Sequence, residues 1–194
     1  MTENQSKKLI VGITGASGIP YGVEVLRQVS SLGLEVHLVL SSAAVRTLKA
    51  ETDLTIKDVE ALATVVHSNK DIGATIASGS FQTLGMIIAP CSIKTMSEIR
   101  SGITGSLISR AADVIMKERR RLVLMVRETP FHTGHLRSMA ALSEMGAVIV
   151  PPVPAFYTRP QTIEDIVSQS VARTLELFGI EGLSVQRWGD PDMP

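Results

Sequence analysis

The sequence predicts an α/β fold: a Rossmann-like or flavodoxin-like three-layer sandwich with a mostly parallel sheet, in a single domain spanning 1–194. Short apolar runs alternate with longer amphipathic stretches, which is typical of strands joined by helical crossovers. The apolar runs contain almost no polar residues, as expected for strands that helices cover on both faces. A chain of 194 residues is also long enough to bury a substantial core.

Five apolar runs are expected to form the strands. The first, LIVGIT, ends at a glycine-rich turn, and the third ends at Pro90, because proline cannot donate a backbone hydrogen bond. The expected strands lie at 9–14, 35–40, 84–89, 122–126 and 147–150.

Amphipathic stretches between these runs predict the helices. Pro20 suits the first turn of a helix and Gly33 suits its end. Residues 68–83, rich in Gly, Ser, Asn and Thr, are expected to form a loop, and four prolines stiffen 151–160. The expected helices lie at 20–32, 42–50, 56–67, 92–100, 106–120, 135–145 and 162–178.

Composition excludes several classes of protein. The 19 basic residues balance 19 acidic ones, which argues against a nucleic-acid binder that relies on an overall basic field. The polar start MTENQSKK and the short apolar runs predict neither a signal peptide nor a membrane span. A single cysteine, Cys91, rules out an internal disulfide framework and a multi-cysteine zinc site, and favours a cytoplasmic location. The 44% hydrophobic content suggests burial on both sheet faces or between subunits.

In parallel sheets, ligands bind beyond the carboxyl ends of the strands. The segments expected there carry small hydroxyls, backbone donors and arginines, the inventory of a site for a phosphate-bearing ligand. They are 14–18, 41–42, 90–95, 127–130, and the proline loop with Phe156, Tyr157 and Arg159.

The turn after the first strand has the spacing Gly12-x-x-Gly15-x-x-Gly18, not the dinucleotide pattern G-x-G-x-x-G. The second strand ends at Ser41 rather than at an acidic residue that would hold an NAD ribose, and no Gly-Lys-Ser/Thr follows the turn. This motif alone therefore supports two interpretations equally, a phosphate-binding turn and an ordinary tight turn. Ser92 and Thr95 likewise allow two interpretations: their hydroxyls either cap a helix or bind an anion.

Arg127 and Glu128 directly follow a buried strand. They are either an ion pair at the sheet edge or an anion-binding arginine with a carboxylate for proton transfer. His132 and His135 have no third ligand in their pattern, so we expect no metal site there. We interpret the run 117–121 (KERRR) first as the solvent-exposed end of a helix, where positive side chains are stabilised by the helix dipole.

Together these motifs resemble the UbiX/Pad-type flavin prenyltransferases over nearly the whole chain. Each motif is weak alone, but their order is specific. They are TGASG with Tyr21-Gly22, Glu51-Thr52-Asp53, Ala77-Ser78-Gly79-Ser80, Pro90-Cys91-Ser92, Arg110-Ala111-Ala112-Asp113, Lys117-Glu118-Arg119-Arg120, Arg127-Glu128-Thr129-Pro130, Pro154-Ala155-Phe156-Tyr157 and Arg187-Trp188-Gly189.

The resemblance implies a metal-independent transferase that moves a dimethylallyl group from dimethylallyl phosphate to reduced FMN. The product, prenylated FMN, would serve a separate UbiD-type decarboxylase. It further implies a homo-oligomer, a dodecamer, with residues 1–7 as a flexible N-terminus and the tail 179–194 closing over the site.

Site residues follow from the resemblance position by position. The positions implied to bind FMN are Gly15, Ala16, Ser17, Ser41, Ser92, Ile93, Lys94, Thr95 and Arg127. Those implied for the prenyl donor are Tyr157, Arg173 and Trp188. Those implied for catalysis, through phosphate binding and proton handling, are Ser17, Glu51, Arg110, Lys117 and Glu128. The basic residues among them are expected to form one cationic pocket.

Two rival functions stay open at this level. Flavin-dependent peptidyl-cysteine decarboxylases carry a Pro-Ala-Ser-Ala-Asn-Thr motif, and the segments 77–83 and 90–95 depart from it. A flavin carrier, or an accessory subunit of a decarboxylase, would not need a second phosphate site, which Tyr157 and Arg173 are expected to provide.

Overall fold

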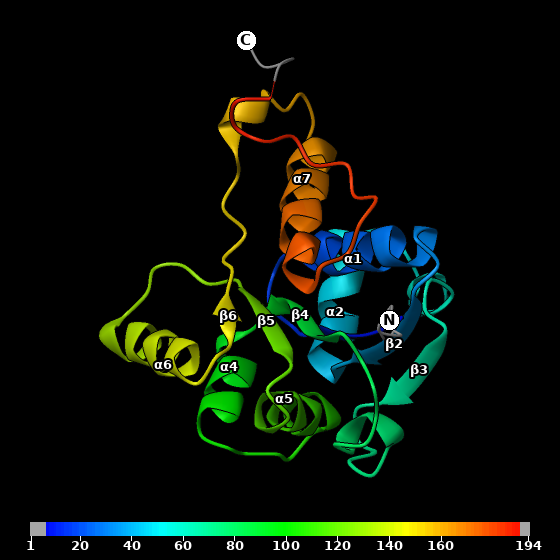
Figure 1. Cartoon of the computed structure of the whole chain (residues 1–194), viewed down its shortest axis with the longest axis vertical. Coiled ribbons are helices and arrows are strands. Elements are labelled where there is room, and N and C mark those ends of the chain that lie inside the picture. Colours follow the sequence, from blue (N-terminus) through cyan, green and yellow to red (C-terminus); the bar gives the residue numbers. More distant parts are fainter. Residues whose placement is uncertain (1–6, 191–194) are drawn as a thin grey trace, which may run out of the picture.

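Six parallel strands form a single sheet in the computed structural model, which describes residues 7–190 (Figure 1). The strands are β1 (Lys8–Ile13), β2 (Glu35–Leu40), β3 (Val65–Ser68), β4 (Gly85–Cys91), β5 (Arg121–Val126) and β6 (Val148–Ile149). Their order across the sheet is β3-β2-β1-β4-β5-β6, and each neighbouring pair is parallel. The predicted parallel α/β sandwich is confirmed.

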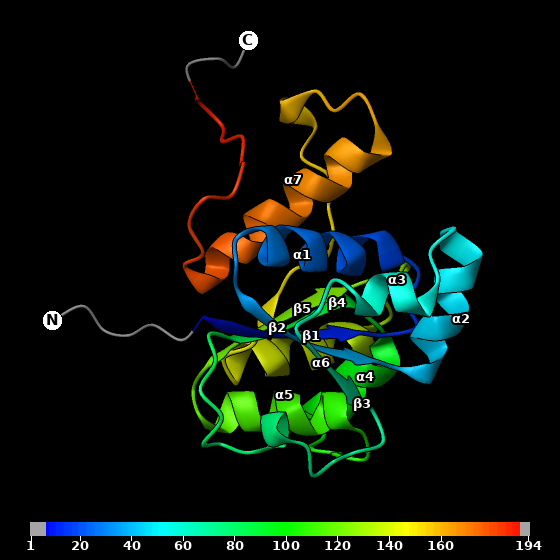
Figure 2. The same cartoon turned by 90° about the vertical axis from the view of Figure 1, so that its right-hand side faces the viewer.

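Helices cover both faces of this sheet, as Figure 2 shows. The first layer contains α1 (Ile19–Ser31), α2 (Ser42–Glu51), α3 (Ile56–Glu60) and α7 (Ile163–Leu175). The second layer contains α4 (Ile93–Arg100), α5 (Leu107–Lys117) and α6 (Thr133–Glu144). Between residues 7 and 190, no helix has the length and apolar character needed to cross a bilayer.

Strand β1 shows how the sequence pattern builds the two cores. Leu9 and Val11 pack with the first layer, whereas Ile10 packs with the second, and all three are fully buried. Successive side chains of a strand point to opposite faces, so a continuous apolar run is what a doubly covered strand requires.

The helix predicted over 56–67 is wrong. Helix α3 begins at a capping box, in which Thr55 and Asp58 bond each other's backbone, but it ends at Glu60. The chain then turns, and Thr64 exchanges hydrogen bonds with Val36 before Val65–Ser68 pairs with β2. A short apolar run fits either a helix or a strand, and here the open edge of β2 selects the strand.

Strand β4 also differs from its prediction, because it continues through Pro90 to Cys91. The pairing with β5 shifts register between Ile88 and Cys91, and sheets tolerate proline at such irregular positions. The predicted helix over 106–120 is shorter than expected. It ends at Lys117, and Arg119 has the left-handed conformation (φ 56°) that ends many helices.

The two ends of the chain were expected to be a flexible N-terminus and a closing tail. Residues 1–6 and 191–194 lie outside the described part. Lys7 is described, and its carbonyl accepts the N–H of Glu35 (2.8 Å). Residues 180–190 run beside α7 (Figure 1), where the side chain of Gln169 bonds the backbone of Gln186.

Strand order places the topological switch between β1 and β4. From this pair the chain builds β2 and β3 on one side and β5 and β6 on the other. In open α/β sheets the crevice at such a switch, beyond the carboxyl ends of the strands, is the usual ligand site.

Candidate functional site

Three helices begin at this carboxyl edge, directly after β1, β2 and β4. Helix α1 follows the left-handed Gly18, and serines cap the other two. The hydroxyl of Ser41 accepts the N–H of Ala44 (3.1 Å), and that of Ser92 accepts the N–H of Thr95 (3.3 Å). Both serines therefore act as helix caps here, and the first amides of α2 and α4 suit an anionic ligand, whereas the amides that begin α1 are already bonded within the chain.

The glycine turn after β1 needs its glycines for space and conformation. A Cβ on Gly15 would lie 2.3 Å from the Cβ of Ala43 at the start of α2. Gly18 has φ 109°, which L side chains rarely adopt. Gly15 and Ala16 are partly exposed, and the Ser17 side chain is exposed, with no hydrogen bond within the part of the chain described. This turn can therefore present backbone and a hydroxyl to a ligand.

Glu51, at the end of α2, binds the amino end of α1. Its Oε2 accepts N–H bonds from Gly18 and Ile19, both at 2.8 Å. A carboxylate is stabilised at this position by the helix dipole. The structure thus places this predicted catalytic residue against the glycine turn.

Arg127 reaches the same turn from β5. Its backbone N–H donates to the carbonyl of Cys91 (3.1 Å), and its side chain passes close to Gly18. Burial raises the pKa of Tyr21, and the Arg127 charge opposes that rise, so a neutral phenol stands beside the arginine. Sequence reasoning assigned Tyr21 no role; its place in the TGASG-x-x-Tyr motif was the available signal.

Glu128 is exposed, and its carboxylate accepts the N–H of Thr129 (2.9 Å). Among residues 7–190 it forms no ion pair with Arg127, so the edge ion-pair reading is not what the fold shows.

The segment after β4 offers mainly backbone groups. Lys94 points to solvent and pairs with Glu98 (2.8 Å), so with Ile93 it would contribute amides rather than its amine. Thr95 is buried beneath Ser92, which donates to its hydroxyl (3.2 Å). Burial raises the pKa of the Cys91 thiol to about 12, which makes it unreactive at neutral pH.

A second group of predicted residues meets between the proline loop and α7. Tyr157 and Arg173 line a cavity of about 110 Å³ beside Met125 and Val150, near the ends of β5 and β6. Trp188, from the tail, stands edge-on to the Tyr157 ring, with centroids 5.6 Å apart. Two aromatic rings and the Arg173 side chain therefore come from three distant segments to one region, where the Arg173 guanidinium pairs with Glu176 (3.0 Å).

Arg110 and Lys117 lie elsewhere. Both belong to α5, in the layer opposite to α7 (Figure 2). Arg110 pairs with Asp113 (3.2 Å), while Lys117 pairs with Glu118, and that pair packs on Gly79. A single copy of the chain therefore does not gather the predicted cationic pocket, because the sheet separates these residues from Arg173.

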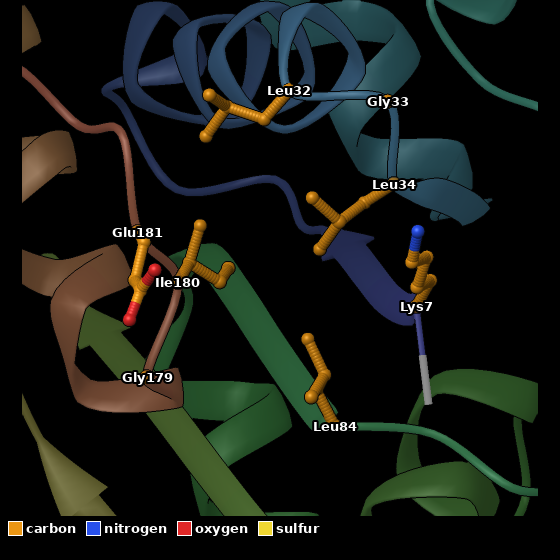
Figure 3. A pocket seen from close by; sticks show the side chains of 8 residues that line it. All are labelled: Lys7, Leu32, Gly33, Leu34, Leu84, Gly179, Ile180 and Glu181. Atoms are coloured by element: carbon orange, nitrogen blue, oxygen red, sulfur yellow. The ribbon is translucent and has the colours of Figure 1, made fainter. Parts of the chain in front are cut away.

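A depression of about 340 Å³ lies at the opposite, amino edge of the sheet (Figure 3). The side chains of Leu34 and Leu84 point into it, with Lys7 and Glu181 on its rim. None of the predicted site residues lines this depression, and it lacks the converging hydrogen-bond donors found at the carboxyl edge.

His132 caps α6, because its Nδ1 accepts N–H bonds from Gly134 (3.0 Å) and His135 (3.4 Å). No cluster of three or more His, Cys, Asp or Glu side chains suited to a metal ion occurs between residues 7 and 190.

Comparison with known proteins adds to this geometry. The flavoprotein family matches residues 1–175. The flavin prenyltransferase UbiX of Escherichia coli K12 is 59% identical over 177 residues, covering 90% of this chain and 93% of that protein.

Two solved structures share the fold closely. One is AnUbiX (PadA1) in complex with FMN and dimethylallyl pyrophosphate: TM-score 0.92, 49% identity, covering 94% of this chain and 97% of that one. The other is the dodecameric FMN-dependent UbiX-like decarboxylase of Escherichia coli O157:H7: TM-score 0.91, 50% identity, covering 94% and 100%. The chain therefore belongs to the flavoprotein family, and within it to the UbiX-type flavin prenyltransferases.

Proposed function

We propose that the chain binds reduced FMN and transfers to it a dimethylallyl group from dimethylallyl phosphate, giving prenylated FMN. The observation that carries this proposal is the presence of two separate sites suited to phosphate groups. One is the cradle formed by the glycine turn 15–18 and the amino ends of α2 and α4, and the other is the cavity of Tyr157 and Arg173. A protein that only carries flavin needs the first and not the second.

The cradle fits FMN on its own geometry. The tight glycine turn, the Ser41 hydroxyl, the first amides of α4 after Ser92 and the Arg127 guanidinium supply donors for a phosphate and a polar ring edge. When bound, the reduced flavin supplies the nucleophile. The chain holds it in place and handles protons near Ser17, Glu51 and Glu128.

The second cavity fits the donor. Breaking the allylic carbon–oxygen bond leaves the electron pair on the phosphate oxygen and a cationic allyl group. Arg173 would hold the phosphate, and the aromatic faces of Tyr157 and Trp188 would stabilise the positive charge. In this proposal Arg110 and Lys117 reach the phosphate of another copy, since the sheet separates them from Arg173 in their own.

A homo-oligomer, with the dodecamer of the Escherichia coli O157:H7 neighbour as its pattern, belongs to this proposal. Its support in the chain is an arm of large exposed apolar side chains: Val153, Phe156, Ile163 and Trp188 are each 73–80% exposed. The proposal also includes hand-off of the product to a UbiD-type decarboxylase. It places the protein in the cytoplasm, which the buried free thiol of Cys91 favours.

Anaerobic incubation with reduced FMN tests the proposal. Dimethylallyl phosphate and dimethylallyl diphosphate are supplied in separate parallel reactions, and the mass of the released flavin is measured by mass spectrometry. We expect a five-carbon adduct that is absent without donor. Unchanged flavin with both donors would indicate that the protein only carries flavin. Turnover of a peptidyl cysteine instead would favour the rival decarboxylase function.

A further inference from the structure

Thr14 joins the two strands at the topological switch. It follows β1, is 1% exposed, and its Oγ1 donates to the carbonyl of Pro90 (2.7 Å). The same oxygen accepts the N–H of Ser92 (2.8 Å), and the backbone N–H of Thr14 also donates to Pro90 (3.2 Å). One buried hydroxyl therefore bridges the ends of β1 and β4.

The bridged segments are the two walls of the crevice. Thr14 precedes the glycine turn 15–18, and Ser92 is the capping residue of α4. Each wall belongs to its own strand–helix crossover. The backbone bond from Thr14 to Pro90 joins the strand ends, but only the hydroxyl reaches Ser92, so without it the amino end of α4 would be held less firmly against the glycine turn. A site whose walls are already held apart correctly loses less conformational freedom when a ligand binds.

We propose that Thr14 is a positioning residue for FMN: its hydroxyl sets the spacing between the glycine turn and the amino end of α4 before the flavin arrives. This inference rests on the proposed FMN site. It assigns Thr14 no contact with the ligand, only the bridge between the segments that make contact.

The chain supplies a matched control at the other end of the same two strands. Thr83 is 8% exposed, and its Oγ1 lies within hydrogen-bond distance of two carbonyls that its one hydrogen can reach, those of Lys8 (2.8 Å) and Gly85 (3.0 Å). It also accepts the N–H of Gly85 (3.2 Å). Its hydroxyl thus ties β1 to β4 in the same manner, but at the amino edge, away from the cradle.

The test compares Thr14→Val, Thr14→Ser and Thr83→Val by thermal unfolding and by FMN titration, followed through flavin fluorescence. Both valine variants should lower the melting temperature, since each leaves a buried amide without its partner. Thr14→Val should weaken FMN binding roughly tenfold. Thr14→Ser and Thr83→Val should stay within about twofold of the wild type.

Three results would overturn the inference. They are unchanged affinity in Thr14→Val, equal weakening in Thr83→Val, and a Thr14→Ser variant as weak as the valine variant. If the wild-type protein binds FMN but makes no prenylated product, the proposed activity is refuted, whereas the comparison of FMN affinities among the Thr14 and Thr83 variants still tests this inference.

Hydrogen exchange of the flavin-free wild type tests the bridge even if Thr14→Val does not fold. The Ser92 amide precedes the first turn of α4, so the Thr14 hydroxyl is its partner. We expect it to exchange much more slowly than the amide of exposed Ser17. Exchange at the rate of Ser17 would show that the bridge is absent.

Discussion

At the scale of single residues, Glu51 combines a structural contact with an expected catalytic role. Its Oε2 caps α1 through Gly18 and Ile19, and within the described chain Oε1 makes no hydrogen bond. One oxygen can thus hold the glycine turn while the other handles a proton. The family resemblance predicted the second role, but the sequence contained no sign of the first.

Glu51→Gln should separate these roles. The glutamine oxygen can still accept both N–H bonds, so we expect FMN affinity within about threefold of the wild type. Prenylation should fall at least about a hundredfold, as is typical when a general acid–base group is removed. Flavin titration and the mass-spectrometric assay measure the two effects, with exposed Glu144→Gln as the control. Lost FMN binding with normal chemistry in the remaining holoenzyme would contradict the assignment.

At the scale of elements, α1 lies directly on β4 because Gly22 has no side chain. A Cβ there would lie 2.3 Å from the carbonyl oxygen of Ala89 and 2.9 Å from Cδ1 of Ile13. This close approach fixes the amino end of α1 over the crevice.

Gly22→Ala should therefore lower the free energy of unfolding by about 1–3 kcal/mol, because a backbone carbonyl cannot move aside cheaply. FMN affinity should fall with it as α1 shifts. Gly105→Ala is the matched control, since open space surrounds its Cβ, and it should change stability by less than about 0.5 kcal/mol. Urea unfolding and flavin titration measure both; equal stability of the two variants would refute the packing argument.

The pairing of β2 with β3 contains a histidine pair. Buried His37 lies between His67 (2.9 Å) and Glu35 (2.9 Å), and Glu35 also pairs with Lys8 (3.0 Å). Burial, and then the nearby His37, lower the pKa of His67, which Asp71 partly opposes. The unfolded chain therefore takes up the His67 proton near pH 6.5, while the folded chain takes it up only at lower pH.

Stability should consequently fall as pH drops from about 7 through the folded pKa of His67. His67→Gln should flatten this part of the profile, measured by urea unfolding at several pH values. The lowered pKa of Glu35, due first to its hydrogen bond with His37, adds a further loss at more acidic pH. A His67→Gln profile with the wild-type slope would show that the pair does not titrate as argued.

At the scale of the whole molecule, the sheet divides the predicted machinery. Arg173 lies on α7 in one layer and Lys117 at the end of α5 in the other, so one copy cannot use both at one donor. Co-expressed Lys117→Ala and Arg173→Ala chains should regain prenylation that each lacks alone, because mixed oligomers contain some intact sites. The double variant is the control, and absence of complementation would contradict a donor site that is shared between copies.

Assembly itself should depend on the exposed apolar arm. Phe156→Ser should shift the protein from its oligomer to smaller species in sedimentation velocity, whereas Phe156→Leu, which keeps an apolar side chain, should not. A wild-type monomer, or an unchanged Phe156→Ser oligomer, would contradict this role for the arm.

The sequence by itself determined the local features of this protein: the alternation of strands and helices, the glycine turn and the serines that begin α2 and α4. These features follow from backbone conformation and side-chain periodicity over a few residues, which the chain records directly. The tertiary structure alone decided that 65–68 joins β2 as a strand and that α5 and α7 lie on opposite faces. It also decided that Thr14 meets Ser92 across 78 positions. Such contacts depend on how separate crossovers pack together, and no local pattern specifies that packing.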